Sequence, residues 1–365
     1  MTRLEACLLL NAIPNIGFFR AAKIVSHFGN AETVFENSVK EWRQVEGLGE
    51  GSCFALKQWK RHQSSVDKQI QMLDTLHIKT LFYGDSAYPK LLSFCPDAPI
   101  VLFYKGNLDF NQRKLISIVG TRTNTQHGKA FCEKLIEALA PYQPIICSGL
   151  AKGIDIIAHR KALEQGLETV ACLAHGLERI YPPQHMETAQ RLCKQGGLLT
   201  DFLPYAPFRR ENFPQRNRLI AGMAHATIVV ESAISGGSMN TATFAHHHGR
   251  ELFAVPGYPT DLKSGGCNQL IFLQKAQLLS DPKELINALG WKKSPQYKST
   301  QKKLFQHLSQ EEVQLKEILL KKKKCLLDEL AIELQWKISD TAARLIQLEM
   351  KGCIRALPGK YFEWI

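Results

Sequence analysis

The spacing of hydrophobic and polar positions changes twice along the chain and divides it into three zones. In residues 1–65, apolar side chains recur at helical spacing in short segments, separated by glycine-containing breaks at 13–17 and 45–49. This pattern predicts short helices joined by glycine turns. The turns either contact phosphate, as in helix–hairpin–helix modules, or are plain helix caps. We therefore expect a helical domain over residues 1–65.

Residues 66–290 instead alternate short apolar runs with helical patterns. The runs predict strands at 115–119, 145–147, 169–173, 198–200, 227–230 and 252–255, and the patterns between them predict helices at 129–140, 155–165, 186–194 and 239–248. Strands that are apolar throughout and joined by helices predict a parallel sheet covered on both faces. We expect an α/β domain over residues 66–290, with a Rossmann-like, doubly wound and mostly parallel sheet.

The last zone returns to helices. Residues 291–309 are mostly polar and basic, with one proline, and predict a linker. Residues 310–365 then show helical patterns at 311–320, 326–334 and 339–351 and a final hairpin pattern around Pro358 and Gly359. Three helices followed by a hairpin is the order of elements in a winged-helix domain, which we expect over residues 310–365.

Composition narrows the class of protein. Hydrophobic residues make up 45% of the 365 residues, which is enough for one large domain and one or two small ones. No run of 18 apolar residues occurs and the N-terminal residues lack a signal-peptide pattern, so we expect a cytoplasmic protein with no membrane segment. The ten cysteines form no CxxC pair, which disfavours zinc ribbons and redox dithiols and fits reduced thiols in the cytosol.

The charge of the chain points to a polyanionic partner. Lysine and arginine number 46 against 34 acidic residues, a net charge of +12, although ordinary solubility charge is the alternative explanation. Residues 291–365 carry 15 basic and 9 acidic residues and so hold half of this excess. The run Lys321–Lys324 beside the expected winged helix either touches a DNA backbone or forms a solvated charged face.

Two glycine turns follow successive predicted strands and lead into helices. The first contains Gly120, Thr121 and Arg122. A helix N-terminus there offers free N–H groups and a positive dipole to an anion, and the arginine adds a charged fork suited to phosphate. The alternative is a tight turn with a surface ion pair. No GxGxxG sequence occurs, so the turn is not a dinucleotide fingerprint.

The second turn could hold another phosphate through Ser148, Gly149, Lys152 and Gly153. Asp155 and His159 follow four residues apart on one helix face, and we expect them to pair and brace the turn. A hydrolytic triad of Ser148, His159 and Asp155 is the competing hypothesis. The missing G-x-S-x-G sequence disfavours that triad.

A third segment, 212–222, places Arg216, Asn217 and Arg218 at the start of a predicted helix. Two guanidinium groups at this position need an anion or a carboxylate opposite them. They therefore either bind phosphate or form a buried brace with Glu231, and the two roles are compatible.

A fourth segment joins a strand to a helix through Gly236, Gly237, Ser238 and Thr241. The glycines allow close approach of the backbone to a ligand, and the hydroxyl groups add hydrogen bonds. The P-loop sequence GxxxxGK[ST] is missing, which disfavours ATP hydrolysis of that kind.

Four such segments, each expected at the end of a successive parallel strand, predict one rim of phosphate contacts. The phosphates of a nucleic-acid strand would span such a rim better than a mononucleotide. The aromatic residues nearby either stack bases or fill the core: Phe202, Tyr205, Phe208 and Phe213. Adjacent histidines on a helix face different directions, so we interpret His246–His248 as exposed surface. We expect no catalytic residue, no metal site and no cofactor.

In this order, the motifs resemble the DNA-processing protein A family, also called DprA or Smf. The resemblance covers roughly residues 80–280 and is carried by YPKLL (88–92), DAPIVLFYKG (97–106), IVGTR (118–122), SGLAKGIDIIAH (148–159), GLERIYP (176–182), FPQRNRLIAG (213–222), SGGSMNT (235–241) and AVPG (254–257). The flanking zones agree with the family's helical N-terminal domain, of SAM or helix–hairpin–helix type, and its C-terminal winged helix. The sequence departs from the family at Pro183, where some relatives carry a basic residue, and at Lys275, where glycine is usual.

The resemblance implies a function as well as a fold. Members of the family bind incoming single-stranded DNA during natural transformation, protect it and load the RecA recombinase onto it. They act as homodimers through the Rossmann domain and have no established catalytic activity. By motif, the family's phosphate-binding pocket corresponds here to Gly120, Arg122, Ser148, Gly149, Lys152, Arg216, Asn217, Arg218, Gly236, Gly237 and Ser238.

Two other functions compete with this one. The first is a Rossmann-fold nucleotide-processing enzyme, similar to a phosphoribohydrolase, in which Glu231 would be the acid. The second is a regulator that binds double-stranded DNA through the winged helix. Fold alone does not decide among the three.

Overall fold

The computed structural model describes residues 1–293, 309–351, 353–357 and 361–364. The chain forms two compact units, Met1–Ser299 and Thr300–Ile365. Most of the predicted linker 291–309 lies outside the described residues, as do Pro358 and Gly359 of the predicted hairpin turn. Among the described residues, no helix is both long enough and apolar enough to span a membrane.

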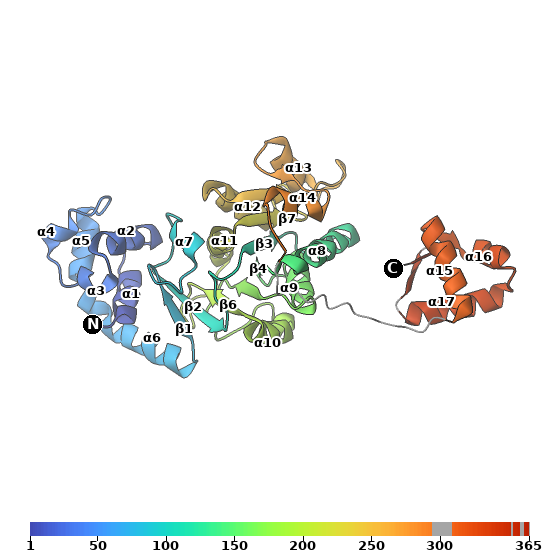
Figure 1. The fold of residues 1–365 in the computed structure, drawn as a ribbon. Coiled ribbons are helices and arrows are strands. Elements are labelled where there is room, and N and C mark those ends of the chain that lie inside the picture. The colour runs from blue at the N-terminus through green and yellow to red at the C-terminus, as the bar shows by residue number, and fades with distance from the viewer. Residues whose placement is uncertain (294–308, 352, 358–360, 365) are drawn as a thin grey trace. The chain divides into compact units, whose positions relative to one another are not determined.

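The first unit begins with short helices, as the glycine breaks predict (Figure 1). They are α1 (Arg3–Ala12), α2 (Phe18–Phe28), α3 (Ala31–Val34), α4 (Val39–Trp42), α5 (Glu50–Lys57), η1 (Trp59–His62) and α6 (Gln63–Thr75). Gly17 and Gly49 are the N-caps of α2 and α5, and neither helix has a side-chain cap. Helix α6 runs through the predicted domain boundary at residue 65, and the apolar core of these helices continues into residues of the sheet.

A nine-stranded sheet forms the centre of the first unit. Its strands are β1 (Lys79–Phe82), β2 (Val101–Gly106), β3 (Leu115–Val119), β4 (Ile145–Ser148), β5 (Thr169–Cys172), β6 (Gly196–Thr200), β7 (Ala226–Val229), β8 (Glu251–Ala254) and β9 (Gln277–Leu278). The order is β1-β2-β6-β5-β4-β3-β7-β8-β9. All neighbours pair in parallel except β1 with β2 and β2 with β6. The expected doubly wound, mostly parallel sheet is confirmed, while β1, β2 and β9 are additions to the predicted strands.

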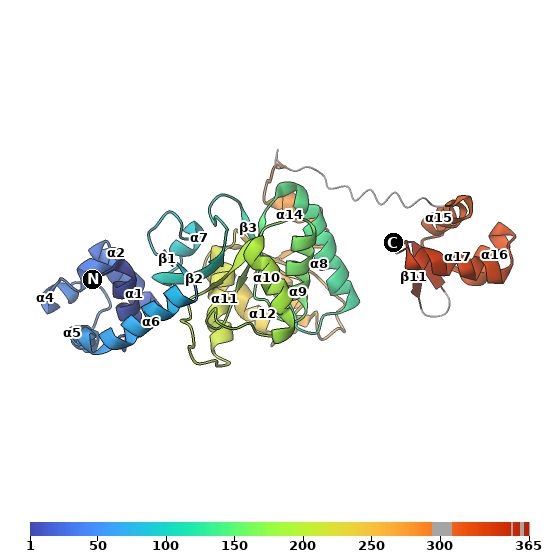
Figure 2. The same ribbon diagram turned by 90° about the horizontal axis from the view of Figure 1, so that it is seen from below.

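Helices cover both faces of the sheet (Figures 1 and 2). They are α7 (Lys90–Ser93), α8 (Gln126–Leu139), η2 (Ala140–Tyr142), α9 (Ile154–Glu164), η3 (Pro183–His185), α10 (Met186–Lys194), α11 (Asn212–Met223), α12 (Gly237–His247), α13 (Gly265–Phe272) and α14 (Pro282–Ala288). Alternate residues of β3 enter different cores, because successive side chains of a strand point to opposite faces. Ile116 and Ile118 pack with α8, α9 and α14, whereas Leu115 and Val119 pack with α11 and α12.

The order of the strands reverses at β3. From β3 the chain moves outward through β4, β5 and β6, and it then returns to place β7 on the other side of β3. In open sheets of this kind, the crevice outside the carboxyl ends of the strands at the reversal is where ligands bind.

The second unit contains the predicted three helices and hairpin strands. Its elements are α15 (Gln310–Lys322), β10 (Cys325–Leu326), α16 (Leu327–Leu334), α17 (Ile338–Met350), β11 (Ile354–Leu357) and β12 (Tyr361–Trp364). Strand β12 lies between β10 and β11, and Leu315, Leu319, Leu345 and Leu348 fill the core. A short strand between the first two helices completes the small sheet.

Candidate nucleic-acid interface

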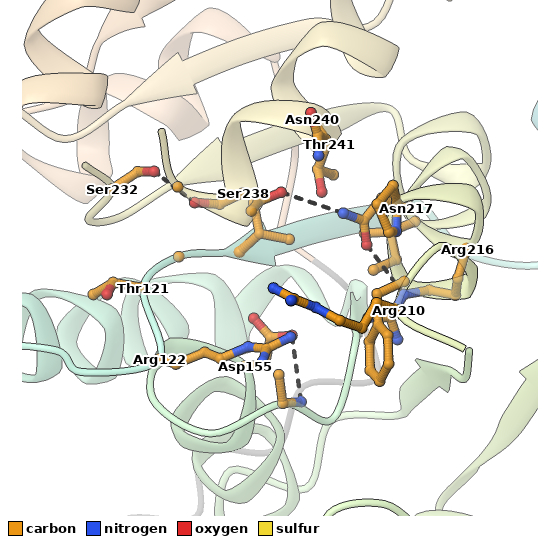
Figure 3. Close-up of a pocket in the computed structure, with 18 of the residues that line it drawn as sticks. Thr121, Arg122, Asp155, Arg210, Arg216, Asn217, Ser232, Ser238, Asn240 and Thr241 are labelled. Atoms are coloured by element: carbon orange, nitrogen blue, oxygen red, sulfur yellow. Dashed lines mark hydrogen bonds between the residues drawn. The ribbon is translucent and has the colours of Figure 1, made fainter. Parts of the chain in front are cut away.

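A cavity of about 630 Å³ lies at the point where the strand order reverses. The loops after β3 and β7, the start of α12, helix α11 and the loop before it supply most of its walls, and Ala151 and Asp155, after β4, also line it (Figure 3). The predicted site residues that line it are Gly120, Thr121, Arg122, Arg216, Asn217, Gly236, Gly237, Ser238 and Thr241. Ser148, Gly149, Lys152, Gly153 and Arg218 do not line it.

The loop after β3 packs closely against the start of α9 at one end and is exposed at Arg122. A Cβ atom on Gly120 would lie 2.6 Å from Cγ1 of Ile154, so no larger residue fits without displacement. The backbone N–H of Thr121 donates to the carbonyl of Glu231 at 2.6 Å, which ties this loop to the end of β7. Arg122 is exposed, and its guanidinium lies 5.5 Å from the centre of the Phe213 ring.

The loop after β7 presents the start of α12 to the cavity. Gly236 is the N-cap, and no side chain caps the helix, so the positive end of its dipole is available to an anion. A Cβ atom on Gly236 would lie 2.4 Å from Ser232 Oγ, whereas one on Gly237 would meet nothing within 4 Å. The hydroxyl of Ser238 donates to Ser232 Oγ at 2.7 Å and stabilises the turn.

The loop after β4 resembles these two in sequence and differs from them in structure. The N–H groups of Gly149 and Ala151 donate to Asp155 Oδ2 at 3.1 and 3.4 Å. Ser148 is fully buried, and its hydroxyl donates to the carbonyl of Ile118 at 2.6 Å. The position predicted for a second phosphate is therefore occupied by a carboxylate of the protein itself. Lys152 is exposed but lies outside the cavity lining.

Two of the predicted pairings are wrong. His159 is hydrogen bonded to Thr169 Oγ1 at 2.8 Å instead of to Asp155, and burial lowers the pKa of His159 to about 3. Because the ring of His159 is hydrogen bonded to Thr169 and the structure gives it no bond to Ser148 or Asp155 among the described residues, the hypothetical hydrolytic triad is not assembled. Glu231 does not brace an arginine either, since its carboxylate accepts hydrogen bonds from the N–H and hydroxyl of Thr125, the N-cap of α8.

Arg216 is the buried floor of the cavity. Its side chain donates to the carbonyls of Gly149, at 2.9 Å, and of Cys172. Burial raises the pKa of the Asp155 carboxyl and lowers that of the Arg216 guanidinium, and the charge of each partner opposes the shift of the other. The acid that faces Arg216 is thus Asp155, and most of the arginine's hydrogen bonds already go to the protein.

Arg216, Asn217 and Arg218 lie in the second turn of α11, and residues 201–211 separate this helix from the end of β6. The expectation that all four segments follow strands is therefore wrong for this one. Asn217 faces the cavity and donates to the carbonyl of Gly237 at 3.3 Å. Arg218 points elsewhere, pairs with the buried carboxylate of Asp201 and lies over the Phe18 ring at 4.2 Å.

The structure adds cavity residues that the motifs do not include. Arg209 and Arg210, on the loop before α11, both line the cavity and are exposed. Within the described part of the chain, neither they nor Arg122 form an ion pair. The sequence does contain a sign of them, since two consecutive arginines stand shortly before FPQRNRLIAG. The family motif itself, however, does not include them.

An aromatic cluster forms one wall beside these arginines. The ring of Phe208 lies 5.0 Å from that of Tyr181 and 5.7 Å from that of Phe213, between ring centres. Tyr181 and Phe208 keep 44% and 41% of their surface exposed. These partly exposed rings form a cluster beside the arginines, so their flat faces are accessible to a ligand.

Comparison with known proteins shows which families the sequence matches. Residues 79–290 match the family described as DNA recombination-mediator protein A, and residues 295–360 match the DprA winged helix domain. Protein Smf of Escherichia coli is 34% identical over 308 residues, which cover 82% of this chain and 81% of that protein. DNA processing protein DprA of Streptococcus pneumoniae is 33% identical over 242 residues, covering 66% and 83%.

Solved structures agree with the sequence matches. The X-ray structure of the S. pneumoniae protein matches with a TM-score of 0.68 at 28% identity, over 79% of this chain and 98% of that chain. A structure of the Helicobacter pylori protein, described in terms of its single-stranded DNA binding mode, matches with a TM-score of 0.54 at 27% identity, over 59% and 97%. The chain therefore belongs to the DNA recombination-mediator protein A family.

Proposed function

We propose that this protein binds single-stranded DNA in the cavity at the end of β3 and β7, protects incoming DNA during natural transformation and loads the RecA recombinase onto it. The observation that carries the DNA-binding part is a set of exposed arginines that have no acidic partner among the described residues, Arg122, Arg209 and Arg210, beside the aromatic wall. Cations that track phosphates next to rings that stack bases are the general means of binding single strands.

The shape of the site favours a strand over a mononucleotide. The uncapped start of α12 suits one phosphate, and the arginines on the loop before α11 suit others along the wall. The aromatic rings carry no sequence preference of their own, because every base has a flat face. The protein would thus hold many sequences with similar affinity.

Fluorescence anisotropy with the full-length protein tests the proposal. A labelled oligo-dT is expected to bind more tightly than a duplex of the same length, and AMP or ATP is not expected to displace it. Tight binding of AMP without binding of oligo-dT would instead support a nucleotide-processing enzyme. Binding of the duplex alone, lost on deletion of residues 298–365, would support a regulator that acts through the winged helix.

We propose further that the protein acts in the cytoplasm as a homodimer formed by the edge of the sheet at β9. This two-residue strand pairs only with β8 among the described strands, and Leu278 on it is 49% exposed. Phe272, at the end of the preceding helix α13, is 84% exposed. Large apolar side chains beside an open strand edge favour association with a second copy.

Light scattering checks this self-association. The full-length protein is expected to have twice the mass of one chain. The Phe272→Arg variant is expected to have the mass of a single chain and an unchanged circular dichroism spectrum. A monomeric mass for the unaltered protein at micromolar concentration would contradict the homodimer. RecA loading is tested separately, by whether the protein speeds RecA assembly on oligo-dT coated with single-strand-binding protein.

A further inference from the structure

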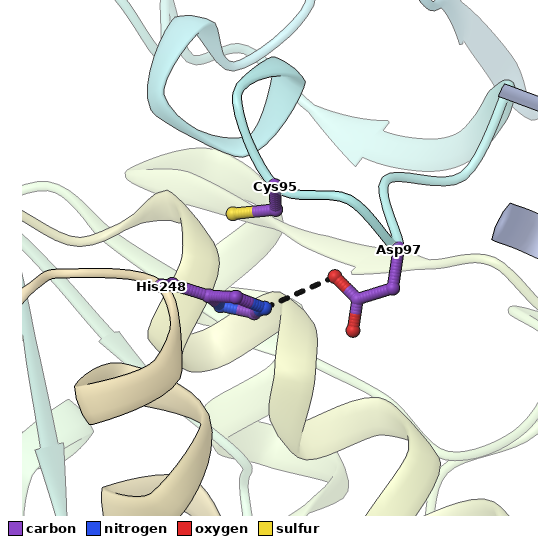
Figure 4. A group of neighbouring side chains, drawn as sticks. All are labelled: Cys95, Asp97 and His248. Carbon is purple, nitrogen blue, oxygen red and sulfur yellow. Dashed lines mark ion pairs between the residues drawn. The ribbon is translucent and has the colours of Figure 1, made fainter. Parts of the chain in front are cut away.

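Cys95, Asp97 and His248 lie close together (Figure 4), and Cys95 belongs to the core that contains residues of α11 and α12. The first two lie in the loop between α7 and β2, and His248 is the C-cap of α12. One potential ligand atom from each residue lies within 4.8 Å of the other two, and His248 Nε2 is 3.1 Å from Asp97 Oδ1. The prediction that all three histidines of 246–248 are exposed surface is therefore wrong for His248, whose side chain is 3% exposed.

The histidine ring is incompletely satisfied. His248 Nδ1 is buried and has no hydrogen-bond partner among the described residues. Buried polar atoms of proteins are nearly always paired, so an unpaired one in such a cluster needs an explanation. The Asp97 carboxylate lies at the other ring nitrogen, Nε2, and an imidazole with a ligand atom within 4.8 Å of a thiol sulfur and a carboxylate oxygen has the surroundings of a metal ligand.

The neighbouring groups suit a metal-bound thiolate. An Arg250 guanidinium nitrogen lies 3.5 Å from Cys95 Sγ, and the same side chain is fixed by the carbonyls of Leu91 and Gly222. A guanidinium N–H at this distance can donate a hydrogen bond to a metal-bound sulfur from outside the ligand set. The thiolate and the carboxylate together would balance the charge of a divalent ion, which leaves Arg250 as an outer hydrogen-bond donor.

An ion could also reach the cluster from solvent. Asp97 lines a second cavity of about 600 Å³, and its side chain is 26% exposed, whereas Cys95 is 5% exposed. Three protein ligands and one position open to a cavity is the arrangement in which zinc keeps a bound water. This cavity also contains Phe18 and Phe244 and shares no residue with the cavity proposed for DNA.

We propose that Cys95, Asp97 and His248 bind one zinc ion per chain, or a similar divalent ion that accepts sulfur and nitrogen ligands, with the fourth position open to the second cavity. The mixed set of sulfur, nitrogen and oxygen ligands selects zinc over magnesium and calcium, which take oxygen ligands. The ion would join the loop before β2 to the end of α12, two segments that are far apart in the sequence. Metal binding would therefore raise the stability of the fold.

Titration of the chelator-treated full-length protein with Co²⁺ tests the site. A thiolate-to-cobalt charge-transfer band is expected to reach its maximum at one equivalent and to vanish when Zn²⁺ is added. Cys95→Ser and His248→Gln are expected to lose the band. The matched controls Cys193→Ser and His247→Gln, which change a cysteine and a histidine outside the cluster, are expected to keep it.

A second measurement does not depend on the variants being folded. Zn²⁺ at one equivalent is expected to raise the thermal midpoint of the unaltered protein above its value in EDTA. If the unaltered protein shows no charge-transfer band and no rise in the midpoint, the cluster is a closed histidine–aspartate pair and the proposal is wrong. A band that persists in Cys95→Ser would also overturn it.

Discussion

Two glycine turns of this protein look alike in sequence and serve different purposes. The turn after β7, Ser235–Ser238, leaves the start of α12 uncapped and facing a cavity. The turn after β4, Ser148–Gly153, directs N–H groups of Gly149 and Ala151 onto the carboxylate of Asp155. A glycine turn at a strand end thus shows that something approaches the backbone closely. Whether it is a ligand or an internal acid depends on the residues of the following helix.

The largest expected effect comes from removing Arg216, the arginine opposite that internal acid. Arg216→Ala would leave Asp155 buried without its cation, and Arg216 and Asp155 are 4% and 7% exposed. Removing a buried cation that lies opposite a buried acid leaves that acid uncompensated, which costs about 3–5 kcal/mol. We expect the free energy of unfolding, measured by urea denaturation, to fall by this amount.

Arg216→Ala also tests whether the turns after β4 and β7 differ in function. If Arg216→Ala kept its stability and lost only affinity for oligo-dT, Arg216 would be a ligand contact and the turn after β4 would belong to the DNA site. Asp155→Asn provides the complementary control, because it removes the negative charge and keeps the shape. We expect it to lower stability as well, since Arg216 would then be the unpaired charge.

Replacing one glycine of each turn by alanine is expected to have a smaller effect on the free energy of unfolding. Gly153 has φ +79°, and a Cβ atom there would lie 2.1 Å from the carbonyl oxygen of Thr121. Gly153→Ala should therefore lower the free energy of unfolding by about 1–3 kcal/mol. Gly237→Ala, where a Cβ atom meets nothing within 4 Å, should change stability by less than about 0.5 kcal/mol.

The affinities of Gly153→Ala and Gly237→Ala for oligo-dT test the difference between the two turns a second time. The Cβ atom of Gly237→Ala would project from a residue that lines the cavity, so we expect weaker binding with normal stability. Gly153→Ala, once folded, is expected to bind at nearly the normal level. Anisotropy titrations on both variants, at a temperature well below their unfolding midpoints, would show whether the two turns differ in this way.

The third effect concerns the exposed arginines and is electrostatic. Arg122→Ala should leave stability unchanged and weaken binding of oligo-dT. The slope of log affinity against log salt should fall by about 0.7 for each phosphate that the variant no longer neutralises. Arg191→Ala, which removes an exposed arginine on α10 outside the cavity lining, is the matched control. Equal slopes for Arg122→Ala and the unaltered protein would remove Arg122 from the interface.

Sequence patterns predicted the architecture better than they predicted the partners of individual side chains. The apolar runs locate β3 to β8, since strands buried on both faces must be apolar throughout. Motif order also brings the turns after β3 and β7 to one cavity. The position of Arg216 opposite Asp155 and the ion pair of Arg218 with Asp201 depend on how α11 packs across the sheet. Spacing along the chain does not contain that information.

The smallest expected effect is that of Lys152, which the sequence motif predicts to be part of a phosphate pocket. Lys152 lies in the turn that is closed on Asp155, and it is exposed outside the cavity lining. A flexible, solvated lysine at this position would contribute only long-range attraction, which salt screens. We therefore expect Lys152→Ala to weaken oligo-dT binding less than Arg122→Ala does, with the larger part of its effect absent at physiological salt. An equal reduction of affinity in both variants at that salt concentration would mean that the strand leaves the cavity across the start of α9. The two glycine turns would then be parts of one continuous DNA path.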